Sequence, residues 1–438
     1  MTATAPARAT LFRALAHRNY RLYFAGQGTS VVGTWITRVA TSWLVWRLSH
    51  SAILLGLVNF SGQVPTFLLA PFAGVWVDRL DRYRVLFVTQ ALAMTQSFAL
   101  AALALTGVIQ VWHIIVLQIF QGCINAFDTP SRQTFLIQIV EDRADLPNAI
   151  ALNSSMVNGA RLIGPAVAGV LIAAVGEGWC FMVDGVSYIA VLASLWLMHL
   201  PRKAYLPSTS RVIDELRAGI RYVREFTPIR AVLLLLALVC LMGMPYSVLM
   251  PMIASNVLHG GAHTYGFLMG AAGVGALGGA LYLASRQSVL GLGRIIVFAS
   301  SLFGAALIAF SFSRNVLLSL FLLLFVGLGF MVQTAASNTV LQSLVREEMR
   351  GRVMAFYTMA FMGTTPFGSL MAGALASRIG APRTIAFGGA FCILGSLAFA
   401  RALPAIREKV RPIYREQGIL PNVAAVRDAT EVEEAVQR

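Results

Sequence analysis

Apolar residues fill most of this chain in long runs that short polar connections separate. A helix needs about 20 mostly apolar residues to cross a bilayer. The first set of runs covers residues 20–46, 52–77, 85–107, 111–139, 147–174 and 179–200, and the second covers 230–256, 264–285, 294–313, 316–344, 351–377 and 382–403. This pattern predicts an all-α polytopic membrane protein with twelve transmembrane helices in two pseudo-symmetric six-helix bundles.

The polar segments divide the chain into five regions. We predict a cytoplasmic N-terminal segment (1–19), an N-terminal bundle (20–200), a cytoplasmic inter-bundle loop (201–229), a C-terminal bundle (230–403) and a cytoplasmic tail (404–438). Within the loop, residues 211–226 place apolar side chains on one helical face, which indicates an interfacial helix on anionic lipid or a plain charged linker. The tail offers little apolar surface, so we expect it to be mobile.

The two halves repeat at one sequence offset. This offset pairs Gly74 with Gly278 and Arg82 with Arg286 in the connections after the second and eighth spans. In the fifth and eleventh spans it pairs Gly164 with Gly368, Ala168 with Ala372, Gly169 with Gly373, Leu171 with Leu375 and Gly176 with Gly380. A duplicated six-helix unit predicts a cavity between the halves near the membrane midplane, as alternating access requires.

Composition and charge agree with a membrane location. Of 438 residues, 57% are hydrophobic and only 12% are charged, whereas soluble domains carry about 25% charged residues. Only Arg47, Arg314, Arg378 and Arg383 fall in connections on the side opposite the N-terminus. The positive-inside rule therefore places both termini of this multi-pass protein in the cytoplasm. The Ala- and Arg-rich composition, with hardly any Lys, favours a bacterial cytoplasmic (inner) membrane. Basic residues spread over many loops also argue against a nucleic-acid partner.

The residue types that support catalysis or metal binding are scattered. The four cysteines lie singly in apolar runs and the six histidines lie apart, so we predict no disulfide, metal site or cofactor. An ATP-binding loop is also missing from the sequence. A membrane-embedded enzyme is a remote alternative, because it would need a close acid–base pair or a nucleophile with its base.

Charges within the spans are costly unless they are paired or hydrated, so they indicate functional positions. Arg38 lies in the first span and Arg161 in the fifth. A central cavity lined by both would favour anionic or polar substrates. The hydrogen-bonding candidates beside them are Thr34, Gln63, Asn153 and Asn158. The alternative is a structural role, such as an ion pair between Arg161 and Asp128.

The loop after the second span holds the most specific motif. It reads Gly74-Val-Trp-Val-Asp78-Arg79-Leu-Asp81-Arg82-Tyr83-Arg84. This motif resembles the loop signature of the major facilitator superfamily. The resemblance implies that Gly74 allows close helix packing and that Asp78, Arg79 and Arg82, together with Asp128, form an inner gate that closes in one state. The alternative is that these charges only fix the topology.

A second motif covers the fifth span. It runs from Asn148 to Gly169 and includes the Gly164-Pro165 pair. Together with Gly33-Thr34-Trp35 and Phe127-Asp128-Thr129-Pro130-Ser131-Arg132, it resembles the enterobactin-exporter-like branch of the superfamily. The Gly164, Pro165 and Gly169 set is similar to an exporter signature. Small residues allow tight helix crossing and a proline can bend the helix, although close packing alone would explain both.

The resemblance implies a secondary active transporter that exports a small siderophore- or drug-like molecule by alternating access. It also implies proton coupling, membrane lipids as partners and a monomer. Two departures weaken proton antiport by the usual residues: Gln118 stands where many relatives have an arginine, and Thr34 where relatives can have an aspartate. Asp128 and Asp184 remain as candidate carriers. An importer or facilitator of the same fold is the alternative function.

Overall fold

A computed structural model describes residues 12–77, 80–140, 142–198, 212–286 and 288–416. In these residues the first half forms six long helices, α2 (Arg18–Ser49), α3 (Ala52–Val77), α4 (Arg82–Leu105), α5 (Val111–Ile139), α6 (Leu146–Val175) and α7 (Glu177–Trp196). In the second half, four further long helices are α11 (Ala262–Ala284), α12 (Leu292–Phe312), α13 (Val316–Leu344) and α16 (Ala381–Glu416). The all-α prediction is confirmed.

The two remaining segments of the second half are interrupted by π turns. Residues 227–257 contain α9 (Thr227–Leu238), η3 (Val239–Gly243), α10 (Tyr246–Met252) and η4 (Ile253–Val257). Residues 350–379 contain α14 (Arg350–Thr358), η6 (Met359–Gly363) and α15 (Thr365–Ile379). With these two segments the described part of the chain has the twelve predicted transmembrane segments. The hydrophobic pattern predicts the segments but carries no signal for the π turns.

Ten of these segments are long and apolar enough to cross a membrane by length and composition. Helix α2 and the segment at 350–379 do not meet that measure. Both carry arginines, including Arg38 in the middle of α2 and Arg350 and Arg352 at the start of α14. A helix that faces a polar interior tolerates such residues because it does not meet lipid on every side.

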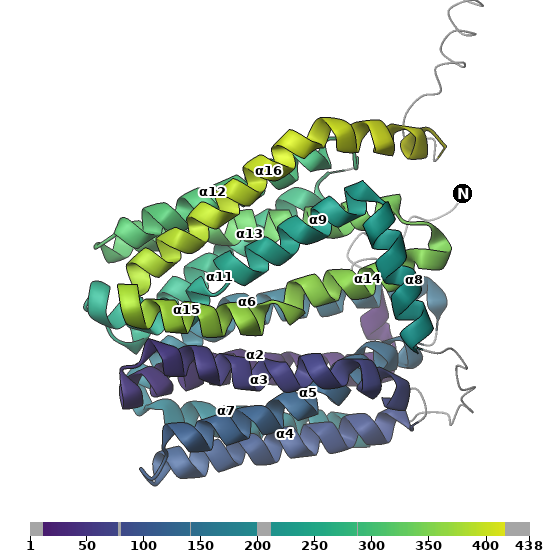
Figure 1. The fold of residues 1–438 in the computed structure, drawn as a ribbon. Helices are drawn as coiled ribbons and strands as arrows, with labels where there is room; N and C mark the ends of the chain where they lie inside the picture. Colours follow the sequence, from purple (N-terminus) through teal and green to yellow (C-terminus); the bar gives the residue numbers. More distant parts are fainter. Residues whose placement is uncertain (1–11, 78–79, 141, 199–211, 287, 417–438) are drawn as a thin grey trace, which may run out of the picture.

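The helices pack as two bundles. Figure 1 shows α2, α3, α4, α5 and α7 in one layer and α9, α11, α12, α13 and α16 in the other. Between the bundles, α6 packs on α11 and α3 packs on α15. These two pairings are equivalent under the repeat, because α6 corresponds to α15. The pseudo-symmetry predicted from the sequence is therefore present in the fold.

Glycines make these two pairings possible. A Cβ atom on Gly169 of α6 would lie 2.9 Å from the Cα atom of Gly266 on α11. At the equivalent crossing, a Cβ atom on Gly373 of α15 would lie 3.1 Å from the Cα atom of Gly56 on α3. Helices α6 and α15 each end at a repeat-related glycine with positive φ, 86° at Gly176 and 84° at Gly380. The left-handed backbone region favours glycine at both ends.

Two polar segments of the chain are helical. Helix α8 (Val212–Glu225) forms where the amphipathic helix was predicted, and Tyr222 and Val223 pack partly buried against the core. The expectation of an unpacked tail from Pro404 is wrong up to Tyr414. Helix α16 continues to Glu416, because Ile406, Val410 and Tyr414 recur every four residues and are buried. The rest of the predicted tail lies outside the described residues.

Candidate functional site

The two bundles are in close contact at the end of the molecule away from α8. Besides the glycine crossings, the rings of Trp43 on α2 and Tyr265 on α11 stack with centroids 6.2 Å apart and planes 19° apart. Figure 1 shows α8 and the C-terminal end of α16 at the opposite end. The bundles are thus sealed together at one end of their helices.

Two arginines from different helices meet at one aromatic ring. The guanidinium carbon of Arg38 lies 4.7 Å from the ring centre of Trp35, and that of Arg161 lies 5.8 Å from the same centre. Both distances are within cation–π range. The side chain of Arg38 is exposed and that of Arg161 is half-buried. The structure thus brings together two positions that lie in separate spans of the sequence.

No ion pair forms at either of these arginines within the described part of the chain. The predicted alternative, an ion pair between Arg161 and Asp128, is wrong, because Asp128 pairs with Arg132 on its own helix. Two like charges at one ring repel each other, so an anion between them would lower the energy of both. The arrangement therefore suits the binding of an anion.

A cavity of about 390 Å³ opens beside Arg161. Its volume falls in the range of about 300–1,000 Å³ that is typical of small-molecule sites. The lining comes from α6, α13, α14 and η6: Asn158, Arg161, Phe330, Met331, Thr334, Ala335, Asn338, Thr339, Tyr357 and Phe361. The lining carries one positive charge and no carboxylate. Its polar groups come from both bundles, as a site of alternating access needs.

The sequence prediction found only one side of this cavity. Asn158 lines it, with its side-chain amide donating to the carbonyl of Ser154 at 2.9 Å. The second-half residues Thr334, Asn338 and Tyr357 were missed. Thr334 and Asn338 stand four residues apart in an otherwise apolar span, a helical spacing that is a usable signal.

The other predicted cavity residues, Arg38 included, do not line this cavity. Thr34 is exposed and donates to the carbonyl of Ser30 at 3.0 Å. Asn153 and Gln63 are half-buried and do not line the 390 Å³ cavity. Gly164 is in contact with α2, because a Cβ atom there would overlap the Cβ atom of Trp35. Gly164 therefore allows α6 to pack closely against Trp35, whose ring lies near both arginines.

Pro165 lies inside α6, which runs unbroken from Leu146 to Val175. Its carbonyl oxygen faces α11, where a Cβ atom on Gly266 would lie 2.6 Å away. Gly169 meets the same glycine one turn further along. The Pro165 and Gly169 pair therefore belongs to the inter-bundle contact, and Gly164 faces α2 instead.

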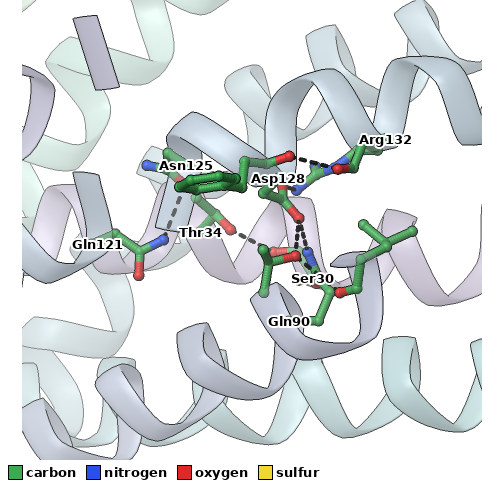
Figure 2. A network of polar contacts seen from close by, with 11 residues as sticks. Ser30, Thr34, Gln90, Gln121, Asn125, Asp128 and Arg132 are labelled. Carbon is green, nitrogen blue, oxygen red and sulfur yellow. Dashed lines mark hydrogen bonds and ion pairs between the residues drawn. The ribbon is translucent and has the colours of Figure 1, made fainter. Parts of the chain in front are cut away.

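Asp128 is the centre of a polar network inside the first bundle (Figure 2). Gln90 and Thr89 of α4 donate to one carboxylate oxygen at 2.6 and 3.1 Å, and Arg132 pairs with the other. Asp128 is 3% exposed. Charge-assisted bonds from two helices make this carboxylate a cross-link between α4 and α5.

The predicted inner gate is only partly within the described structure. Asp78 and Arg79 lie outside the described residues, and Gly74 falls near the end of α3. Arg82 opens α4, whose first turn is capped by Asp81 through a 3.0 Å bond from the amide of Tyr83. The described contacts of Asp128 are with α4 and its own helix. The gate therefore stays a prediction.

Asp184 is a second buried carboxylate in the first bundle, 2% exposed on α7. One oxygen accepts from Ser97 of α4 at 2.8 Å, while the other has no well-formed hydrogen bond among the described residues, and the hydroxyl of Thr37 of α2 lies beside the carboxylate. A Cβ atom on Gly33 of α2 would lie 2.7 Å from that second oxygen. A carboxylate that is neither paired nor fully hydrogen-bonded is costly in this setting, so Asp184 is a candidate for proton binding.

Replacing Asp128 with alanine is expected to lower the stability of the protein in detergent by roughly 2 kcal/mol or more. The variant removes the acceptor of three donors and leaves Arg132 without its carboxylate. Thermal unfolding of the purified protein measures the effect. The double variant Asp128→Ala/Arg132→Leu should recover part of the loss, and an unchanged unfolding midpoint in the single variant would contradict the cross-link.

Comparison with known protein families gives one match over nearly the whole chain. The transmembrane secretion effector family matches residues 3–425. The chain is 27% identical over 381 residues to the staphyloferrin A transporter of Staphylococcus aureus, covering 86% of this chain and 95% of that protein. It is 26% identical over 393 residues to the multidrug efflux pump Tap of Mycolicibacterium fortuitum, covering 87% and 94%. These similarities extend along nearly the full length of both relatives.

Solved transporter structures share the fold. A bacterial homologue of the iron transporter ferroportin in an inward-facing state superposes with a TM-score of 0.66 at 16% identity, covering 88% of this chain and 98% of that one. A bacterial homologue of the lysosomal transporter Spinster, inward-facing and occupied, gives 0.67 at 15% identity, covering 92% and 98%. At such identities the likeness concerns the fold alone.

Proposed function

The chain belongs to the transmembrane secretion effector family of the major facilitator superfamily, and from that membership we propose that it exports a small organic anion by alternating access. The proposed negative charge of the substrate rests on the pair of arginines at Trp35, beside a cavity whose described lining has no carboxylate. Family members are transporters, so the enzyme alternative is set aside. The enterobactin-exporter-like branch stays a prediction.

Alternating access is supported by the repeat and by the two inter-bundle crossings. With both termini in the cytoplasm, as the distribution of basic loops favours, the sealed end faces outward and the cavity extends from the middle of α6 and α13 toward their cytoplasmic ends. This is the inward-facing state. The stack of Trp43 on Tyr265 then acts as the outer gate, and the loop with Asp78, Arg79 and Arg82 acts as the inner gate. We propose a monomer in the inner membrane as the transporting unit.

Export is supported by the names of the relatives, which include efflux pumps. We further propose that the proton gradient drives it. Asp184 is the better candidate carrier, because Asp128 already forms an ion pair with Arg132. An importer or a facilitator of the same fold would share the geometry of the cavity and differ in the direction of transport or in its coupling to protons.

The test is transport in proteoliposomes with a panel of matched anionic, neutral and cationic compounds. We expect labelled anions to move out of vesicles faster when the outside is acidic, and Asp184→Asn to abolish this acceleration by pH. Transport of cations in preference to anions would overturn the proposed substrate charge. Equilibration of anions with no response to the pH gradient would make the protein a facilitator, and acceleration in the opposite direction would make it an importer.

A further inference from the structure

Three of the eight residues that the second bundle supplies to the cavity lining are aromatic. Phe330 of α13, Tyr357 of α14 and Phe361 of η6 all line it. The rings of Tyr357 and Phe361 are nearly parallel, with planes 4° apart and centroids 6.2 Å apart, and Phe361 and Phe330 are 28° and 6.2 Å apart. Three rings in similar orientations therefore follow one another along this wall.

The backbone positions these rings. Phe361 lies in the π turn at Met359–Gly363, between α14 and α15. Such a turn adds a residue to the helix and changes the direction of the side chains in it, and π turns occur often at functional sites. Tyr357 is held by its hydroxyl, which donates to the carbonyl of Thr334 at 3.3 Å. Phe330 is fixed by burial, with 4% of its surface exposed.

Tyr357 and Phe361 are only half-buried, so they keep surface toward the cavity. Aromatic side chains that serve only the core bury nearly all of their surface, as Phe303 does behind Phe330. On the other side of the cavity, α6 presents Asn158 and Arg161. One wall thus suits an aromatic ring, through stacked or edge-to-face contacts, and the other suits an anionic group.

We propose that the transported anion carries an aromatic ring, which binds on Tyr357 and Phe361 while its acidic group lies at Arg161. This inference rests on the proposed function and narrows its substrate class to aromatic acids. Asn338 and Thr339 lie on the same wall as the rings and supply hydrogen-bonding groups for polar substituents on the ring. An aliphatic acid of equal charge would meet Arg161 and gain less from the aromatic wall.

The test compares 2-naphthoate with its saturated analogue decahydro-2-naphthoate, because the two share charge and carbon skeleton. Binding to the purified protein in detergent is measured by calorimetry. We expect naphthoate to bind about tenfold more tightly. Phe361→Leu should reduce that ratio to near one, mainly by weakening naphthoate binding, and Arg161→Ala should weaken both acids while the ratio is kept.

A phenylalanine outside this cavity provides the control. Phe321 of α13 lies 55% exposed in an apolar groove between α6, α11 and α13, so Phe321→Leu should leave the ratio unchanged. Equal affinities for the two acids in the unaltered protein, with no effect of Phe361→Leu, would overturn the aromatic site and leave the anion proposal standing. Failure of both acids to bind, while cations bind, would overturn the proposed function and this inference together.

Discussion

Replacing Arg161 with alanine is expected to weaken the binding of an anionic substrate by about 10- to 100-fold. Charged hydrogen bonds contribute about 1.5–3 kcal/mol, and each 1.4 kcal/mol is a factor of ten. Arg161 lines the cavity and shares the ring of Trp35 with Arg38, so its loss removes half of the positive charge at the site. Binding of a labelled anion to purified protein measures the effect.

Two further variants serve as comparisons for Arg161→Ala. Arg161→Lys keeps the charge but loses the planar fork, so it should recover only part of the affinity. Arg383→Ala removes an exposed arginine at the start of α16 that does not line the cavity, and should leave binding unchanged. Unaltered anion affinity in Arg161→Ala would show that the cavity does not bind the anionic group at this position.

Replacing Gly327 with valine is expected to prevent stable folding of the second bundle. A Cβ atom on Gly327 of α13 would overlap the carbonyl of Ala272 on α11, and a Cβ atom on Gly275 of α11 would overlap the carbonyl of Leu324 on α13. Overpacking costs about 1–3 kcal/mol and more where the obstacle is backbone. Membrane helices associate mainly through such close packing, so this crossing has no simple way to relax.

The yield of monodisperse protein and its thermal unfolding midpoint in detergent measure this loss. Gly278→Val is the matched control, because Gly278 lies one turn from Gly275 on the same helix and a Cβ atom there meets nothing within 4 Å. The two substitutions make the same change in residue type. Equal behaviour of Gly327→Val and Gly278→Val would mean that the α11–α13 crossing does not limit stability.

The fold was largely predictable because the lipid environment constrains the sequence of every span in the same way. Each span has to satisfy its backbone hydrogen bonds within a helix and present apolar side chains to lipid. Every transmembrane helix therefore appears in the sequence as a local run of apolar residues. The predicted span at 111–139 coincides with α5, and the predicted repeat reappears in the paired crossings of Gly169 and Gly373. Helix α16 was underestimated because its last turns bury only one face, which a search for long apolar runs does not detect.

The site was predictable only in part. Arg38 and Arg161 could be named from the sequence, since a charge within a membrane span is costly and therefore indicates a functional position. Their common neighbour Trp35 could not, whereas the i, i+4 spacing of Asp128 and Arg132 is a signal that the sequence contains. Arg132 pairs with Asp128 because both lie on one face of α5, whereas Arg161 of α6 meets Trp35 of another helix, α2. The pair within α5 follows from the helical spacing, whereas the meeting of Arg161 with Trp35 depends on how the helices rotate about their axes.

The sequence by itself determined that this chain spans a membrane, that it has twelve segments and that its halves are related. These features follow from hydrophobicity, charge and repetition, which act along the chain. Only the tertiary structure decided which residues meet in the cavity, since Asn158, Asn338 and Phe361 come from separate segments. It also placed Phe361 in a π turn, a change of register that depends on packing. Contacts between distant segments depend on helix rotation and close packing, which no local pattern records.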